Sequence, residues 1–378
     1  MSTNNENINK ETKNPNVPHL RFPEFFEEWK RVELKDVAEF QKSRIPADGL
    51  DASCYISTEN LIPNFGGIKE ASSIPTDGNV MAIKPNDILI SNIRPYLKKV
   101  WQSDRFGGCS ADVFVLRTTG CQGDFLYNII ASDKFINYVM SGVKGVKMPR
   151  GDKRQMEEFE FSIPTIEEQN RISRLLSLLD ERIATQNKII DKLQSLIKGI
   201  RNDVFGKLRK DIGLNAKVGD VLSYEQPQPY IVEDTEYTAG GTPVLTANKA
   251  FVLGYTSETD GIYDKGDCII FDDFTLDCKY VDFPFKVKSS AIKILTAKNK
   301  ELLRYTFEFL KYLDLSTDEH KRHYIAETQN QEFILPTTQI VRTIAHAFST
   351  LSSRMQTIVK QRDMLELQKQ YLLRQMFI

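Results

Sequence analysis

The sequence predicts a mixed α/β protein in which two globular heads are separated by two long, antiparallel, coiled-coil-like helices. Two observations carry this prediction. An apolar, helix-like segment occurs twice at a fixed distance, and the region before each copy is rich in β-branched and aromatic residues interrupted by turn signals. Such a pattern indicates an internally repeated chain built from two head-and-helix halves.

The repeated segment begins at Phe161 and again at Phe333, and the two copies stay in register without a gap as far as Phe205 and Phe377. A weaker alignment, at a slightly wider spacing, places residues 86–111 on residues 266–291. The helical parts therefore repeat well and the heads poorly, which favours a duplicated scaffold that carries two diverged heads. Identical residues in the two helical copies include Pro164 and Pro336, Ile172 and Ile344, Leu179 and Leu351, Arg182 and Arg354, and Asp191 and Asp363.

Apolar residues recur in both copies at alternating steps of three and four, which is a heptad seam. A helix from Thr165 to Phe205 is about 60 Å long at 1.5 Å per residue. Because each helix carries one apolar stripe, we expect the two helices to pack against each other. Gln186, Arg362 and Lys369 interrupt the seam. The seam residues are Ile172, Leu176, Leu179, Ile183, Ile190, Leu193, Ile197, Ile200 and Val204 in the first copy, and Ile344, Phe348, Leu351, Met355, Ile358, Leu365, Leu372 and Met376 in the second.

The heads contain short alternating runs typical of strands, separated by turn signals such as Asp77-Gly78 and Gly240-Gly241. Short helices are expected at Gly123–Ser141 and Glu301–Leu313. We therefore expect a disordered tail at 1–16, a first head at 17–160, a central helix at 161–210, a second head at 211–332 and a C-terminal helix at 333–378.

Composition excludes few function classes. The 50 Lys and Arg residues balance 51 Asp and Glu, so any nucleic-acid footprint must be a local patch. No apolar run is long enough to span a membrane, and the polar N-terminus lacks the apolar core of a signal peptide. The five widely spaced cysteines indicate free thiols, so we expect a cytoplasmic protein.

No complete catalytic motif is found. Phosphate-binding loops, dinucleotide fingerprints, nucleophile elbows and common zinc motifs are all missing from the sequence. His320 and His323 fit a solvated surface better than a metal site. Asp272, Asp273 and Asp277, beside a lysine, leave a metal-dependent nuclease open as an alternative.

Basic clusters are the positive signal. Residues 142–154 hold five cations and three glycines, and residues 94–99 mix cations with Tyr96. Cations neutralise phosphates, arginine can also reach guanine edges, and glycine lets the backbone approach a phosphate. The second head has clusters in comparable places. The candidate DNA contacts are Arg94, Tyr96, Lys98, Lys99, Lys144, Lys147, Arg150, Lys153, Arg154, Lys279, Lys286, Lys288, Lys321, Arg322 and His323.

Two motifs resemble a known family. Val17–Trp29, VPHLRFPEFFEEW, looks like the opening of the specificity subunit of Type I restriction–modification enzymes, and Ile163–Ile183 resembles that family's central helical region. The resemblance covers the whole chain in the order head, helix, head, helix. The second copy departs from the pattern, because Thr338-Gln339-Ile340-Val341 replaces Ile-Glu-Glu-Gln and Ser352-Ser353 replaces Asp-Glu, which puts equal docking at both ends in doubt.

The resemblance implies that each head reads one half of a bipartite double-stranded DNA site, and that the helices set the gap. It also implies that two modification subunits dock on the chain and bring S-adenosylmethionine, and that restriction subunits bring ATP and Mg²⁺. This chain itself is then expected to hold no catalytic residue, cofactor or metal. The alternative is a helical scaffold with two protein-binding heads and no DNA role. The expected partner contacts are Glu167, Glu168, Gln169, Asp180, Arg182 and Arg354.

Overall fold

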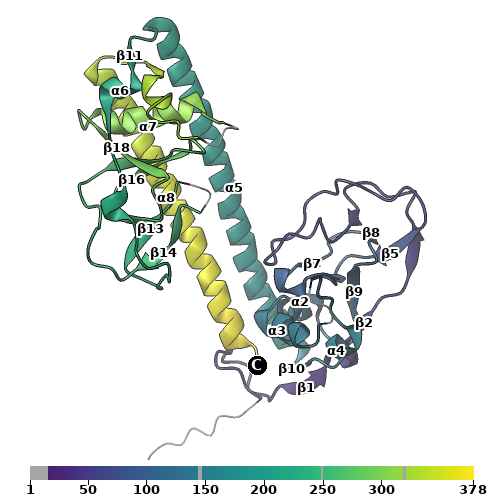
Figure 1. The fold of residues 1–378 in the computed structure, drawn as a ribbon. Helices are drawn as coiled ribbons and strands as arrows, with labels where there is room; N and C mark the ends of the chain where they lie inside the picture. The colour runs from purple at the N-terminus through teal and green to yellow at the C-terminus, as the bar shows by residue number, and fades with distance from the viewer. Residues whose placement is uncertain (1–15, 144–146, 248–249, 318–320) are drawn as a thin grey trace, which may run out of the picture. The chain divides into compact units, whose positions relative to one another are not determined.

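The computed structural model describes residues 16–378 except 144–146, 248–249 and 318–320 (Figure 1). The expected tail, apart from its last residue, and the candidates Lys144 and His320 lie outside this described part. The chain divides into two compact units, Met1–Ala184 with Asp363–Ile378, and Thr185–Arg362. Each unit therefore contains one head together with a part of both long helices, whereas the domain limits expected from the sequence stay a prediction.

The head of the first unit is built on two four-stranded sheets and two helices. The caps explain where the helices begin, since the Gln122 side chain accepts from the Phe125 N–H and the Ser132 hydroxyl accepts from the Phe135 N–H. One sheet has the order β2 (Ala38–Phe40), β9 (Val113–Thr118), β6 (Ile88–Ser91), β7 (Val100–Gln102); the other has the order β3 (Arg44–Pro46), β5 (Asn79–Ile83), β8 (Gly107–Cys109), β4 (Tyr55–Ile56); the helices are α2 (Gly123–Ile130) and α3 (Asp133–Ser141).

The head of the second unit repeats the first of these sheets. In the first unit Ile90 pairs with Phe114, and in the second unit Ile270 pairs with Ile294, so both strands recur at the spacing of the weaker sequence alignment. The weak upstream repeat seen in the sequence is therefore a real duplication of the sheet. Its order is β12 (Leu222–Glu225), β18 (Ile292–Ala297), β15 (Cys268–Asp272), β16 (Cys278–Val281); beside it lie β14 (Val252–Thr256), β13 (Thr242–Leu245), β17 (Lys286–Val287) and α7 (Leu302–Leu313).

A second duplicated element was not recognised in the sequence. The one-turn helices α1 (Leu34–Val37) and α6 (Val218–Val221) each carry at their third position an aspartate that accepts a backbone N–H, Asp36 from Glu33 at 2.9 Å and Asp220 from Lys217 at 2.8 Å. The two segments lie farther apart in the sequence than the residues matched in either alignment. The alignments therefore did not detect this repeat. The strands that flank them are β1 (Lys30–Glu33) with β10 (Glu160–Ile163), and β11 (Ala216–Lys217) with β19 (Glu332–Phe333).

The two long helices are α5 (Ile166–Asp211), with 46 residues, and α8 (Thr338–Met376), with 39. Every seam residue predicted from the sequence is buried or half-buried. The start of α5 shares a core with the end of α8 in the first unit, and the end of α5 shares a core with the start of α8 in the second. The helices therefore run in opposite directions, and the finer coiled-coil geometry stays a prediction. Lys369, which breaks the seam, forms an ion pair with Asp180 at 2.6 Å.

Each long helix ends on a head helix through an aromatic contact. At the end of α5, the rings of Phe205 and Tyr305 are 5.3 Å apart. At the end of α8, the rings of Phe377 and Phe125 are 5.2 Å apart. Phe377 is the counterpart of Phe205 in the helical repeat, and Tyr305 is the counterpart of Phe125 in the register that relates the two sheets. The duplication therefore extends to how each helix anchors its head.

The five cysteines are unpaired thiols. Burial raises the pKa of Cys109, Cys268 and Cys278 to about 12, so these thiols stay protonated at neutral pH and behave as small core residues. Within the described ranges, no helix combines the length and apolar character that crossing a bilayer requires.

Candidate nucleic-acid interface

In the first head, the two basic clusters predicted separately from the sequence are joined by backbone hydrogen bonds. The Arg94 N–H donates to the carbonyl of Pro149 at 2.8 Å, and the Gly151 N–H donates to the carbonyl of Asn92 at 3.1 Å. We call residues 92–99 and 147–154 together the first loop pair. The first of its two segments, residues 92–99, follows directly on the carboxyl end of the buried strand β6. The sheet therefore fixes the position of this segment.

The first loop pair has an unusual backbone. Arg94 and Lys98 flank a single turn of 3₁₀ helix, Pro95–Leu97, and both adopt the left-handed region, with φ of 52° and 54°. The neighbouring Asn64 and Phe65 do the same, and their N–H groups donate to Leu97 and Lys98 at 2.9 Å. Left-handed backbone is unfavourable for side chains larger than glycine, so such residues persist where the surrounding structure fixes them, commonly at functional sites.

Several cations of the first loop pair are used internally. Lys98 pairs with Asp133 at 2.7 Å, the Lys99 ammonium donates to the Thr58 carbonyl at 2.6 Å, and Arg150 lies 3.4 Å from Asp112. Lys153 lies over the Phe114 ring at 4.6 Å. These contacts position the loops rather than leaving each cation free for a ligand.

Three cations of the first loop pair, Arg94, Lys147 and Arg154, are exposed, and their side chains form no hydrogen bond, ion pair or ring contact with another described residue. Burial is the main cause that lowers the pKa of Lys99; the nearby charges of Lys69 and Arg94 lower it further, and the charge of Glu59 opposes them. Tyr96, which is 49% exposed, lies in the same turn. The surface is therefore suited to a polyanion with stacking groups.

The second head has an equivalent loop pair, residues 272–279 with 321–325. The His323 N–H donates to the carbonyl of Asp273 at 3.0 Å, and one carboxylate oxygen of Asp273 accepts from His323 and Tyr324 at 3.1 and 2.8 Å. In the register of the helical repeat His323 is the counterpart of Gly151, so the donors of the two bonds correspond. The acceptors differ by one residue, because the register of the sheets places Asp272, not Asp273, on Asn92. The same register places Arg322 on Arg150, and the Arg322 guanidinium lies 5.9 Å from the centre of the Phe274 ring.

Two predicted contacts of the second head are buried. Lys286 is 3% exposed, with its ammonium bonded to the Glu258 carboxylate and the Asp260 carbonyl, and His323 is 1% exposed. Neither side chain presents a surface to DNA, so we leave both out of the proposed interface. Charge alone suggested surface positions, whereas each side chain has acidic or carbonyl partners that stabilise it inside the head.

The remaining basic candidates of the second head are closer to the surface. Lys279 is half-buried and pairs with Asp277 at 3.0 Å, and Lys321 pairs with Glu327 at 2.9 Å. Lys288 and Arg322 are exposed. Lys288, Lys321 and Arg322 are therefore the basic candidates of this head that the structure leaves at the surface.

The aspartates that left a nuclease open have structural roles in this head. Asp273 is buried 3.6 Å from the ammonium of Lys293, and Asp272 accepts from the N–H groups of Phe274 and Thr275 at 2.9 Å. Burial opposes ionisation of Asp277, but Lys279 and Lys311 outweigh it and lower its pKa. Across the described ranges, no three His, Cys, Asp or Glu side chains are grouped so that they could hold a metal ion. These acids, together with Lys293, hold the second loop pair in place. Sequence reasoning missed Lys293, although this lysine interrupts an apolar strand.

The helical motif is likewise used within the first unit. The buried Glu168 carboxylate accepts two hydrogen bonds from the Arg21 guanidinium, at 2.8 and 2.7 Å. The buried Gln169 amide accepts from the Gln122 N–H and donates to the Pro164 carbonyl, both at 2.9 Å. Glu168 and Gln169 therefore tie the opening motif and the head to the helix and are not available to a partner. Of the other partner candidates, Asp180 is paired with Lys369, and Glu167, Arg182 and Arg354 are exposed.

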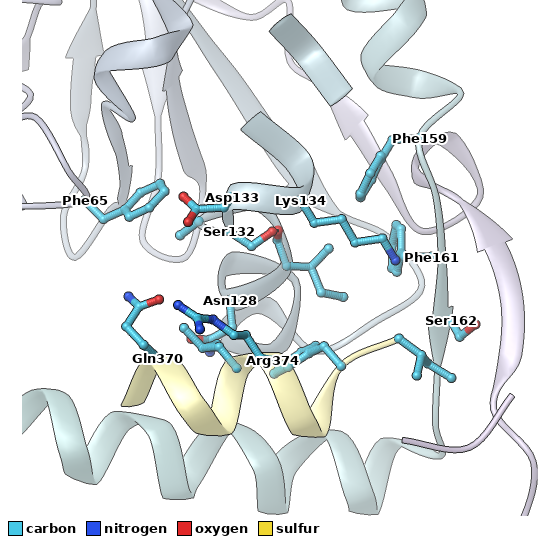
Figure 2. A pocket seen from close by; sticks show the side chains of 15 residues that line it. Phe65, Asn128, Ser132, Asp133, Lys134, Phe159, Phe161, Ser162, Gln370 and Arg374 are labelled. Carbon is cyan, nitrogen blue, oxygen red and sulfur yellow. The ribbon is translucent and has the colours of Figure 1, made fainter. Parts of the chain in front are cut away.

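A cavity of about 280 Å³ lies in the first unit beside the end of α8 (Figure 2). Phe65, Phe159 and Phe161 supply apolar walls, and Lys134 and Arg374 add cations. Burial, together with the charge of Arg31, lowers the pKa of Lys134. The walls are mainly apolar and present no arrangement of nucleophile and base, so the loop pairs stay the candidate interface.

Comparisons with known proteins agree with this picture. Residues 26–195 match the family described as Type I restriction modification DNA specificity domain. The chain is 45% identical over 126 residues to the Type I restriction enzyme EcoR124I/EcoR124II specificity subunit of Escherichia coli, which covers 32% of this chain and 31% of that protein. It is 26% identical over 193 residues to the MjaVIII specificity subunit of Methanocaldococcus jannaschii, and this match covers 50% of this chain and 44% of that protein. The chain thus matches less than half the length of these relatives.

Solved structures show the same fold. The Type I restriction-modification system S subunit from M. genitalium aligns with a TM-score of 0.62 at 16% identity, covering 96% of this chain and 99% of that one. A chain from a structure of the complex assembly and conformational transition of the type I R-M system aligns with a TM-score of 0.50, also at 16% identity, covering 91% and 96%. The two-headed arrangement of mixed helix and strand is therefore shared with these proteins.

Proposed function

Because residues 26–195 belong to the Type I restriction modification DNA specificity family, we propose that this chain is the DNA-specificity subunit of a Type I restriction–modification complex. In this role each head reads one half of a bipartite double-stranded DNA site, and α5 and α8 set the number of unread base pairs between the halves. The family match covers only the first half of the chain, and the proposal extends the same role to the whole chain.

One observation carries the proposal. Both heads present exposed cations on a loop pair at the corresponding place of the duplicated four-stranded sheet. In each, a backbone hydrogen bond from an equivalent donor, Gly151 or His323, joins the two loops. A protein-binding scaffold has no need to repeat a cationic surface at one position of both heads. DNA, in contrast, offers a phosphate backbone and base edges at each half-site, and both suit lysine and arginine. The balanced net charge is compatible with this, because a nucleic-acid footprint needs only a local patch of cations.

The proposal assigns the catalytic steps to partner subunits. Two modification subunits bind this chain and bring S-adenosylmethionine for adenine methylation, and restriction subunits bring ATP and Mg²⁺. This chain contributes recognition and assembly only, and the complex acts in the cytoplasm, where the chromosomal DNA lies. The exposed residues of the long helices, Glu167, Arg182 and Arg354, are the candidates for subunit contacts that the structure leaves accessible.

The two heads offer different surfaces, which supports an asymmetric site. The first loop pair presents Arg94, Lys147, Arg150 and Arg154, whereas the second presents Arg322 beside Phe274. Sequence is read by side chains that reach base edges, so heads with different side chains at equivalent positions are expected to prefer different bases.

The test is to co-express the full chain with its modification subunit and to map adenine methylation across the host genome. We expect one motif made of two half-sites with a fixed gap, methylated only when this chain is present. A complex that forms but adds no methylation in any bipartite motif would contradict the recognition role and favour the scaffold. Loss of duplex DNA affinity as salt is raised separates the two further, because phosphate contacts release counterions and protein contacts in a scaffold do not.

A further inference from the structure

We propose that Arg94 is a base-reading residue of the first head and that it recognises a guanine through its major-groove edge. This inference rests on the proposed function and deepens it, because it assigns one base preference to one side chain. The position, the backbone and the unpaired charge of Arg94 carry the inference, and no other described cation of the first loop pair combines them.

Arg94 is held at a fixed position. Its N–H donates to the Pro149 carbonyl at 2.8 Å, and its own carbonyl accepts from the Leu97 N–H at 2.9 Å. Ile93, the residue before Arg94, forms a β-bridge with Arg150. Pro95, the residue after Arg94, disfavours the right-handed helical conformation at Arg94. A side chain that starts from such a fixed backbone loses little freedom when it binds, which is what discrimination between bases requires.

The backbone of Arg94 is unfavourable for arginine. With φ at 52° it lies in the left-handed region, where glycine is favoured because it has no Cβ. Arginine at this position lowers the stability of the head relative to glycine. Residues in a strained conformation are found mainly at functional sites, where the side chain is needed. The strain at Arg94 therefore points to a contact that forms only when the protein binds its ligand.

The Arg94 guanidinium is free to make that contact. It is exposed and forms no hydrogen bond, ion pair or ring contact with another described side chain, whereas Lys98, Lys99 and Arg150 in the same loop pair each have a partner. Guanine presents two acceptors in the major groove that match the two parallel donors of a guanidinium. The other free cations, Lys147 and Arg154, lack the fixed left-handed anchor and are suited to phosphates.

The second head lacks this arginine. The register that relates the two sheets places Phe274 where the first head has Arg94. The guanine preference is therefore expected in only one of the two half-sites. The aromatic ring at the equivalent place of the second head favours contact with an apolar group, such as a thymine methyl.

The experiment uses the complex of the full chain with its modification subunit and a set of duplexes in which each base pair of the mapped site is changed in turn. Arg94→Gly is expected to be at least as thermally stable as the wild-type protein. It is also expected to lose roughly 10- to 100-fold of the discrimination at one G·C pair of one half-site, while the other half-site keeps its preferences. Arg94→Lys is expected to recover only part of this discrimination, because a lysine lacks the planar pair of donors.

Lys147→Ala is the matched control. As a phosphate contact it is expected to weaken binding equally for all sequences and to reduce the salt dependence. The inference is overturned if Arg94→Gly keeps full discrimination at every position, or if it weakens all sequences equally as Lys147→Ala does. It is also overturned if the first head's half-site contains no guanine. If the wild-type complex shows no bipartite preference at all, the proposed function fails first, so the two failures are distinguishable.

Discussion

Replacing Phe205 with alanine is expected to lower the free energy of unfolding of the second unit by about 4 kcal/mol. Phe205 is fully buried, and its ring lies 5.3 to 5.5 Å from those of Tyr305, Phe309 and Tyr312. Truncation removes the buried ring and leaves a cavity at the point where α5 meets α7. The loss is therefore expected to separate the head from the helix that carries it.

Urea unfolding followed by circular dichroism measures this loss, and hydrogen exchange of residues 302–313 locates it. Leu196→Ala is the matched control, because Leu196 lies on the same helix but is 51% exposed. We expect that control to change the free energy by less than about 0.5 kcal/mol. Equal shifts in the two variants would show that Phe205 does not anchor the second head.

Replacing Arg21 with alanine is expected to lower the free energy of unfolding of the first unit by about 3 kcal/mol. The partner carboxylate, Glu168, has no exposed surface, and the Arg21 side chain is 11% exposed. The substitution leaves a buried charge without its two hydrogen bonds, and this is costly because the carboxylate cannot be rehydrated. The opening motif would then detach from the start of α5.

The control is Arg31→Ala, because Arg31 pairs with Glu160 at the surface, where the two side chains are 69% and 50% exposed. Solvent screens such a pair, and little measurable change is expected. The denaturation midpoints of the two variants decide the matter. A small effect of Arg21→Ala, similar to that of Arg31→Ala, would mean that the opening motif is not fixed by this pair.

The long helices could be predicted because their signal is local and repeated. Each seam residue, from Ile172 to Met376, follows the heptad rhythm, and the structure buries or half-buries all of them. The role of Glu168 and Gln169 could not be found in this way, since their partners Arg21 and Gln122 come from distant parts of the chain. A pattern within one segment does not show which remote segment will contact it.

The candidate interface shows the same limit. Sequence reasoning found the basic clusters of the first head but could not show that residues 92–94 and 149–151 are joined, because the bonds between them come from the backbone. It also placed Lys286 and His323 at the surface, since charge usually indicates exposure. Both are buried beside acidic side chains, Glu258 and Glu327, that the sequence does not associate with them.

The most direct test of two separate reading heads is to exchange residues 17–160 for the corresponding head of a relative and to map adenine methylation again. The account predicts that one half of the bipartite motif changes while the other half and the gap between them stay the same, because the second head and both long helices are untouched. A change in both halves, or in the gap alone, would contradict the assignment of one half-site to each head.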